Sequence, residues 1–227
     1  MNDMSQPLYI FDLDETLISA DSAILWHQFL VTKGIITDPE FLTEDQRLMT
    51  LYSAGKLDMP EYLNFSMAPL AQIPKEQVDS LVDECVEKYI MPMVFPQALQ
   101  LLAQLKQDNI TTVLISATVS FIVKKVAKQL GIDHAMGIDM LVEDGCYSAN
   151  ILGVASYREG KVTRLESWLA EQTEIFTDTY FYTDSINDLP LCEFSQYPHV
   201  VNPCPQLARH AQAQHWPQLA WSPLTEQ

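Results

Sequence analysis

The sequence of 227 residues is 48% hydrophobic and 19% charged, which is typical of a globular chain with a sizeable core and excludes a disordered segment. Its 13 Lys and Arg against 30 Asp and Glu leave a formal net charge of −17, which excludes nucleic acid as an expected partner because a phosphate backbone would be repelled. No apolar run approaches the roughly 20 residues that cross a bilayer, and the N-terminus lacks the basic flank of a signal peptide. We therefore expect no membrane partner and a cytoplasmic location.

The N-terminal part of the chain begins with a strand pattern and then becomes helical. Residues 8–11 form a short β-prone run that ends in the acidic stretch Asp12-Leu13-Asp14-Glu15-Thr16, which is typical of a buried strand followed by a functional turn. Apolar residues then recur at helical spacing over 21–33, and helical patterns continue over 41–54, 61–68 and 75–89. Because no convincing strand interrupts them, we expect an all-helical insertion.

Beyond residue 93, strands and helices alternate. This alternation predicts an α/β fold with a doubly wound, Rossmann-like parallel sheet. We expect a core domain from residues 1–16 and 94–227, with residues 17–93 inserted as a helical cap domain. The predicted elements are a helix over 97–107, a strand over 111–115, a helix over 119–130, a hairpin around 143–145, a helix over 161–171, a strand over 180–183, a helix over 187–194, a strand over 199–201 and a final helix after 205 with a strand or loop behind it.

Polar residues follow the predicted strands. In an open α/β sheet, ligands bind beyond the carboxyl ends of the strands, so these residues should meet at one edge. Taken singly, each has a plainer interpretation, since Asp14 or Thr16 could cap a helix and residues 184–188 could be a simple loop. Their order and their positions at strand or helix ends favour a shared site. They are Asp12 and Asp14 after the first strand, Ser116 after the second, Lys161 before a helix, and Asp184 and Asp188 after the third strand.

Four carboxylates at one edge would repel each other unless a cation were bound. Oxygen ligands favour Mg²⁺, and water and substrate phosphate oxygens complete the coordination shell of this ion. A carboxylate can attack phosphorus to give an acyl phosphate, and a second acid two residues away can move the protons. The cluster therefore predicts a Mg²⁺-dependent phosphate site, with Ser116 and Lys161 placed to hold phosphate oxygens.

The ordered motifs resemble the haloacid dehalogenase-like superfamily, subfamily IB, a group of phosphatases that includes phosphoserine phosphatases. Its D-x-D-x-T motif matches residues 12–16, its strand ending in Ser or Thr matches residues 113–116, its lysine matches Lys161, and its acidic fourth motif matches residues 183–188. The resemblance implies a type C1 cap and an aspartyl-phosphate intermediate. It implies the following roles: Asp12 as nucleophile, Asp14 as general acid and base, Ser116 and Lys161 as phosphate ligands, Thr16, Ala117 and Asn187 as substrate contacts, and Mg²⁺ held by the side chains of Asp12 and Asp184 and the carbonyl of Asp14, supported by Asp188.

The cap sequence bears on the substrate. Phosphoserine phosphatases place an acidic residue after the first motif to receive the substrate amine, and Asp21 occupies the matching position. They also carry an arginine for the substrate carboxylate soon after a Gly-Lys-Leu stretch. Here Gly55-Lys56-Leu57 is followed by residues 58–64, which contain no arginine, and Arg47 lies before this stretch. Because guanidinium is the preferred partner of a carboxylate, an amino-alcohol phosphate fits better than a phosphorylated amino acid.

The chain thus looks more like the branch that includes bacterial histidinol-phosphate phosphatases, which serve histidine biosynthesis. Phosphoserine phosphatase, of serine biosynthesis, is the first alternative. A non-catalytic module that binds a phosphorylated metabolite and a phosphotransferase to an acceptor alcohol remain open as well. We expect a small-molecule phosphate ester as the partner and a monomer or homodimer. The substrate ring could be received by Asp58, Glu61, Trp26, Phe29, Tyr62 and Phe65, although for any single aromatic residue a place in the core is the favoured interpretation.

Overall fold

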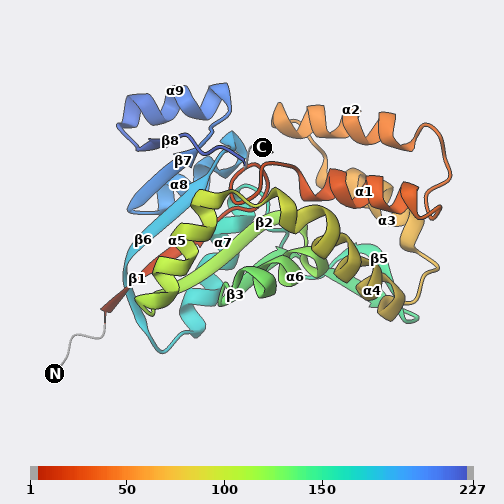
Figure 1. Ribbon diagram of the computed structural model, residues 1–227, viewed down its shortest axis with the longest axis horizontal. Coiled ribbons are helices and arrows are strands. Elements are labelled where there is room, and N and C mark those ends of the chain that lie inside the picture. The colour runs from red at the N-terminus through yellow and green to blue at the C-terminus, as the bar shows by residue number, and fades with distance from the viewer. Residues whose placement is uncertain (1–4, 224–227) are drawn as a thin grey trace.

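The computed structural model describes residues 5–223 and contains a six-stranded parallel sheet at its centre (Figure 1). The strand order is β3-β2-β1-β6-β7-β8, so β1 lies between β2 and β6, the strands that lead to the second and fourth predicted motifs. This order confirms the predicted doubly wound sheet. The strands are β1 (Ser5–Phe11), β2 (Thr111–Val119), β3 (His134–Ile138), β6 (Ile175–Thr183), β7 (Tyr197–Val201) and β8 (Gln218–Leu219).

Helices cover both faces of this sheet because the buried strands are apolar on both sides. Leu8 and Ile10 of β1 pack in one hydrophobic cluster with Leu165 and Leu191, whereas Phe11 points into a second, larger cluster. The alternation follows the period of two along a strand. The flanking helices are α5 (Pro96–Gln107), α6 (Ser120–Leu130), α7 (Glu159–Glu171), α8 (Leu189–Phe194) and α9 (Pro205–Gln214).

The segment between β1 and α5 is helical, as predicted, and gathers at one end of the molecule (Figure 1). Its buried side chains, such as Trp26 and Leu63, join the same hydrophobic cluster as Phe11 and Leu114 of the sheet. Its α-helices and the sheet are therefore packed against one another without a break. They are α1 (Ser22–Thr32), α2 (Phe41–Ser53), α3 (Met59–Met67) and α4 (Lys75–Cys85), after which a π-helical turn (Val86–Ile90) and a 3-10 turn (Met91–Met93) lead to α5.

The predicted hairpin is present as β4 (Met140–Glu143) and β5 (Cys146–Ile151). It contacts the helical segment, since the N–H of Lys75 donates to the carbonyl of Gly145 at 2.9 Å and the Tyr147 hydroxyl donates to Asp79 at 2.9 Å. The hairpin thus holds the start of α4. None of the helices in the described part of the chain has the length and apolarity of a membrane span.

The sheet differs from the prediction at several strands, and β6, for example, begins at Ile175 instead of residue 180. Strand β3 was not predicted, because its sequence HAMGI contains Ala and Gly, which have low strand propensity. Strand β2 runs to Val119 instead of stopping at residue 115, with an irregularity between the pairs Ile115–Met136 and Val119–Ile138. Ser116 therefore lies within a distorted strand end rather than in a loop.

Candidate active site

Asp12 directly follows β1 and lies at the centre of a buried charge network. Its backbone N–H donates to the carbonyl of Tyr182 at 2.9 Å, which fixes the backbone between β1 and β6. Lys161, in the first turn of α7, has a side chain only 1% exposed and places Nζ 2.7 Å from Asp12 Oδ1. The same Nζ lies 2.7 Å from both oxygens of Asp188 and donates to Oδ2. The structure thus brings two predicted carboxylates onto the predicted lysine.

Burial and neighbouring charge shift the pKa values of this network. Burial raises the pKa of Asp12 to about 7, with Asp188 and Asp14 adding to the rise and Lys161 opposing it. Burial alone would lower the pKa of Lys161, but Asp12 and Asp188 outweigh it and raise this pKa. Burial, followed by Asp12 and Asp188, also raises the pKa of Asp184 well above its ordinary value. The network therefore contains one ammonium and three carboxyl groups, so ionisation of all three would leave net negative charge.

The carboxylates form an oxygen-only donor set that suits Mg²⁺. The charge of Asp12 opposes ionisation of Asp184, whose Oδ1 accepts a hydrogen bond from Thr16 Oγ1 at 3.2 Å. Within residues 5–223 no three His, Cys, Asp or Glu residues are grouped so as to hold a metal ion. Two carboxylates with a backbone carbonyl fit Mg²⁺, because this ion keeps several waters and binds substrate phosphates.

Asp14 follows Asp12 by two residues, and its carboxylate is oriented by donors from two other segments. Oδ1 accepts the backbone N–H of Ser22 at 2.6 Å, whereas Oδ2 accepts the hydroxyls of Thr118 at 2.9 Å and Ser116 at 3.3 Å. Thr118 was missed by the sequence analysis. Its two-residue spacing from Ser116 on the same strand was the available signal, since such residues share a face.

Ser116 and Ala117 lie in the distorted end of β2, next to Asp14. The Ser116 hydroxyl is fully buried and accepts the N–H of Thr118 at 3.0 Å, while its carbonyl accepts the Ser156 hydroxyl at 2.5 Å. Ala117 lines a pocket together with Asp14 and Thr118. The distorted end of β2 therefore faces both Asp14 and this pocket.

Two residues beside the charge network reach the helical segment instead. Asn187, predicted to contact substrate, donates from Nδ2 to the backbone carbonyl of Tyr52 at 2.9 Å. Arg158, which the sequence analysis missed, donates to the backbone carbonyl of Gly55. Gly55 has φ +67°, and a Cβ at this position would lie 2.8 Å from the Arg158 guanidinium. We call these four residues the crossing contact, because they join α2 and its C-terminal turn to the loops before α7 and α8.

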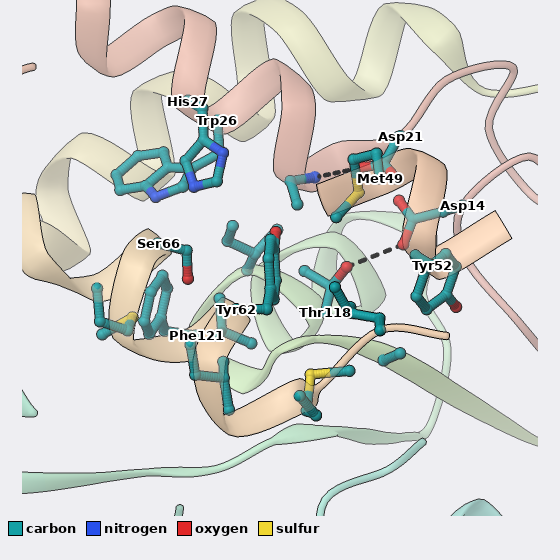
Figure 2. A pocket seen from close by; sticks show the side chains of 18 residues that line it. Asp14, Asp21, Trp26, His27, Met49, Tyr52, Tyr62, Ser66, Thr118 and Phe121 are labelled. Carbon is teal, nitrogen blue, oxygen red and sulfur yellow. Dashed lines mark hydrogen bonds between the residues drawn. The ribbon is translucent and has the colours of Figure 1, made fainter. Parts of the chain in front are cut away.

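The pocket next to Asp14 encloses about 610 Å³, counting its open mouth, and is walled largely by apolar side chains of α1, α2, α3 and α6 (Figure 2). Figure 2 shows Asp14, Asp21 and Thr118 at one end and Trp26 and His27 at the other. No Lys or Arg occurs among the lining residues, which all lie in the described part of the chain. The pocket therefore suits an apolar or cationic group better than an anionic one.

Asp21 caps α1 and also offers a carboxyl group to the pocket. Its Oδ1 caps α1 by accepting the N–H groups of Ala23 at 2.9 Å and Ile24 at 3.0 Å, as an N-terminal aspartate commonly does. Burial, with a further contribution from Asp14, raises the pKa of Asp21 to about 8. A ligand cation beside this carboxyl would favour its charged form.

The structure also sorts the residues that the sequence analysis offered for a substrate ring. Trp26 and Tyr62 line the pocket, whereas Phe29 and Phe65 are not among its lining residues. Asp58 is exposed and caps α3, and Glu61 is exposed. Arg47 is 51% exposed and lies 2.7 Å from Glu44 and 3.8 Å from Glu61, so it does not supply the cation missing from the pocket.

Comparisons with known proteins agree with this geometry. A family model of haloacid dehalogenase-like hydrolases matches residues 9–193. The histidinol-phosphatase of Neisseria meningitidis serogroup C (strain 8013) is 38% identical over 216 residues, which cover 93% of this chain and 97% of that protein. A crystal structure of a Bordetella pertussis Tohama I protein of unknown function has a TM-score of 0.86 at 33% identity, covering 95% of this chain and 98% of the other. A phosphoserine phosphatase structure, a phospho-aspartyl intermediate analogue, shares the fold with a TM-score of 0.68 at 20% identity, covering 90% of each chain.

Proposed function

The chain belongs to the haloacid dehalogenase-like hydrolase family, and from this premise we propose that it is a Mg²⁺-dependent phosphomonoester hydrolase with histidinol phosphate as its substrate. The observation that carries the proposal is the buried contact between Asp12 and Lys161 beside a pocket that contains Asp21 and is lined by neither Lys nor Arg. The similarity to a histidinol-phosphatase supports the same reaction.

In the first half of the proposed reaction, Asp12 is the nucleophile. Lys161 holds Oδ1, so Oδ2 is the oxygen free to attack phosphorus. The new bond from Oδ2 to phosphorus forms as the bond to the ester oxygen breaks, and that oxygen leaves as an alcohol by taking a proton from Asp14. Asp14 suits this role because the contacts to Ser22 and Thr118 fix its carboxyl at the pocket boundary.

In the second half, water attacks the aspartyl phosphate. The Asp14 carboxylate takes a proton from this water, the bond from phosphorus to Asp12 breaks, and inorganic phosphate leaves with the Asp12 carboxylate restored. Lys161 stays against Asp12 throughout, and the Ser116 hydroxyl is placed beside Asp14, where phosphate oxygens would pass. Such groups stabilise charge on the equatorial oxygens of the transferring phosphoryl group.

Mg²⁺ would be held by the side chains of Asp12 and Asp184 and the carbonyl of Asp14, with Asp188 supporting. When bound, it neutralises charge between these carboxylates and the phosphate. We also propose that residues 17–93 act as a cap over the core of residues 1–16 and 94–227. Three helices of this segment wall the pocket, so it can select the leaving group and exclude water.

The pocket favours an amine-bearing substrate without a carboxylate. A substrate ammonium would pair with Asp21, and Trp26, Tyr62 and Phe121 offer aromatic surface for a flat ring. The carboxylate of phosphoserine would meet no Lys or Arg among the lining residues. Because a carboxylate without a bidentate cationic partner binds weakly, phosphoserine fits this pocket less well. Phosphoserine is therefore the second candidate.

The test is phosphate release by the purified protein with Mg²⁺, measured for histidinol phosphate, phosphoserine and p-nitrophenyl phosphate. We expect histidinol phosphate to give the highest kcat/KM and Asp12→Asn to abolish release from all three. Chelation should stop the reaction, and added Mg²⁺ should restore it. A non-catalytic module would bind the phosphates without releasing phosphate. A clear preference for phosphoserine would contradict the substrate proposal, and a fully active Asp12→Asn variant would contradict the mechanism.

A further inference from the structure

A buried pair of polar side chains, His27 and Asp45, lies at the far end of the pocket and has no part in the proposed chemistry. His27 on α1 lines the pocket and is 1% exposed, and Asp45 on α2 is 2% exposed. Nδ1 of His27 lies 3.0 Å from Oδ1 of Asp45. Aromatic rings surround the imidazole, with Phe41 at 5.2 Å and Phe65 at 6.2 Å between ring centroids. Figure 2 shows His27 at the opposite end of the pocket from Asp14.

The contact between the two side chains is close but does not complete a hydrogen bond. Both Nδ1 of His27 and Oδ1 of Asp45 remain without a hydrogen-bond partner among the residues that the structure describes. A buried polar atom without a partner costs free energy, and such atoms in native proteins call for a specific explanation. A ligand that turned the imidazole into line with Asp45 would remove this cost.

The chemistry of the pair determines what ligand it would accept. With Nδ1 turned toward a carboxylate, the Nδ1 proton points at Asp45 and the opposite ring atom, Nε2, is the acceptor available to the pocket. Between the pair and Asp14, burial and the charges of Asp21 and Asp45 raise the pKa of Tyr62 well above its ordinary value. Carboxyl groups therefore lie at both ends of the pocket, Asp14 and Asp21 at one end and Asp45 behind His27 at the other, and the far end offers a hydrogen-bond acceptor.

We propose that His27 determines substrate specificity by accepting a hydrogen bond from a ring N–H of the substrate at Nε2, with Asp45 as the residue that positions it. This inference rests on the proposed function and names the far end of that substrate as a nitrogen heterocycle. The phosphate would lie at Asp12, the amine at Asp21 and the ring between Trp26 and Tyr62, with its N–H directed at His27.

The test compares two phosphate esters that share an amine but differ in the ring: histidinol phosphate and phosphoethanolamine. For His27→Phe we expect kcat/KM for histidinol phosphate to fall roughly 10- to 100-fold, mainly through KM, because a buried hydrogen bond is lost. The value for phosphoethanolamine should stay within about 2-fold. His27→Gln should recover part of the loss because an amide oxygen can replace Nε2. Asp45→Asn should lower histidinol phosphate turnover selectively but less.

Matched controls are available on the exposed faces of the same helices. Gln28→Ala and Gln46→Ala adjoin His27 and Asp45 but are exposed, so both should leave the two substrates unchanged. An equal loss for both substrates in His27→Phe, or no loss for either, would overturn the specificity role while leaving the phosphatase proposal intact. A wild-type protein that releases phosphate from no ester would instead overturn the proposed function.

Discussion

The two sides of the candidate site are built in different ways. At the carboxyl edge of the sheet, each charged group is held by several short polar contacts, as when Lys161 contacts Asp12 and Asp188 at 2.7 Å. The pocket wall formed by α1, α2 and α3 is mainly apolar and contains neither Lys nor Arg. We infer from this difference that the residues at the sheet edge carry out the phosphate chemistry, whereas the pocket wall determines which leaving groups are accepted. Substitutions at the edge should affect every substrate, and those in the wall only some.

The largest effect is expected at Lys161, which contacts two of the carboxyl groups at the sheet edge. Lys161→Met would leave Asp12 and Asp188 buried without their cation, which we expect to lower the free energy of unfolding by about 3–5 kcal/mol and to remove all activity. Denaturant unfolding and phosphate release measure the two effects. Lys88→Met is the control, because Lys88 is 61% exposed and its substitution should leave the free energy of unfolding nearly unchanged. Equal stability of the two variants would contradict the buried network.

Asp14→Asn should separate proton transfer from the rest of the edge. We expect the rate of the first step for alkyl phosphates such as histidinol phosphate to fall about 10²- to 10⁴-fold, because the alkoxide leaves without a proton. The loss of this rate for p-nitrophenyl phosphate should be smaller, since nitrophenolate needs no proton to leave. Release of the alcohol or p-nitrophenol in the first turnover provides the measurement, because breakdown of the aspartyl phosphate, in which Asp14 also acts, is common to both esters. An identical loss for the two leaving groups would argue against Asp14 as the acid.

Asp21→Asn should change substrate selection by the pocket without changing the phosphate chemistry at the sheet edge. Asparagine also caps helices, so α1 keeps its N-terminal hydrogen bonds and stability should change little. The lost charge should lower kcat/KM for amine-bearing esters roughly 10- to 100-fold and leave p-nitrophenyl phosphate unaffected. If kcat/KM for p-nitrophenyl phosphate fell as much as for the amine-bearing esters, Asp21 would act in the phosphate chemistry and not in substrate selection.

The crossing contact should give a smaller effect. Gly55→Ala places a Cβ 2.8 Å from Arg158 at φ +67°, whereas Gly34→Ala has the same conformation, φ +68°, with nothing within 4 Å. Both substitutions should cost about 1–2 kcal/mol from the left-handed backbone. Only Gly55→Ala should also lower kcat/KM a few-fold, because it disturbs the register between the helices and the edge. Equal activity of the two variants would show that the crossing contact has no role in turnover.

The smallest effect is expected at Arg47. Because this side chain lies at the surface against Glu44, Arg47→Ala should leave the free energy of unfolding nearly unchanged and the preference between histidinol phosphate and phosphoserine unchanged. Competition assays with both esters would show this. A selective loss of phosphoserine hydrolysis would mean that Arg47 reaches the substrate after all.

The same contrast explains how much could be predicted from the sequence. Asp12 and Asp184 each follow a strand and Ser116 lies in the last part of one, and parallel strands bring their ends together whatever the details of packing. The pair of His27 and Asp45 had no such signal, since the two residues lie on different helices whose approach depends on side-chain packing. Arg158 was missed because only the fold places its guanidinium on Gly55. Strand β3 was missed because neighbouring β2 and α6, rather than its own residues, determine its conformation.

The position of Trp26 has a practical consequence. It is the one tryptophan among the pocket-lining residues, stacked on Phe29 at 5.7 Å between ring centroids. The other three tryptophans pack elsewhere, Trp168 on Phe176, Trp216 beside His210 and Trp221 near Tyr182. Occupancy of the pocket should therefore be visible in the intrinsic fluorescence of the unlabelled protein, and Trp26→Phe would show which part of the signal comes from it.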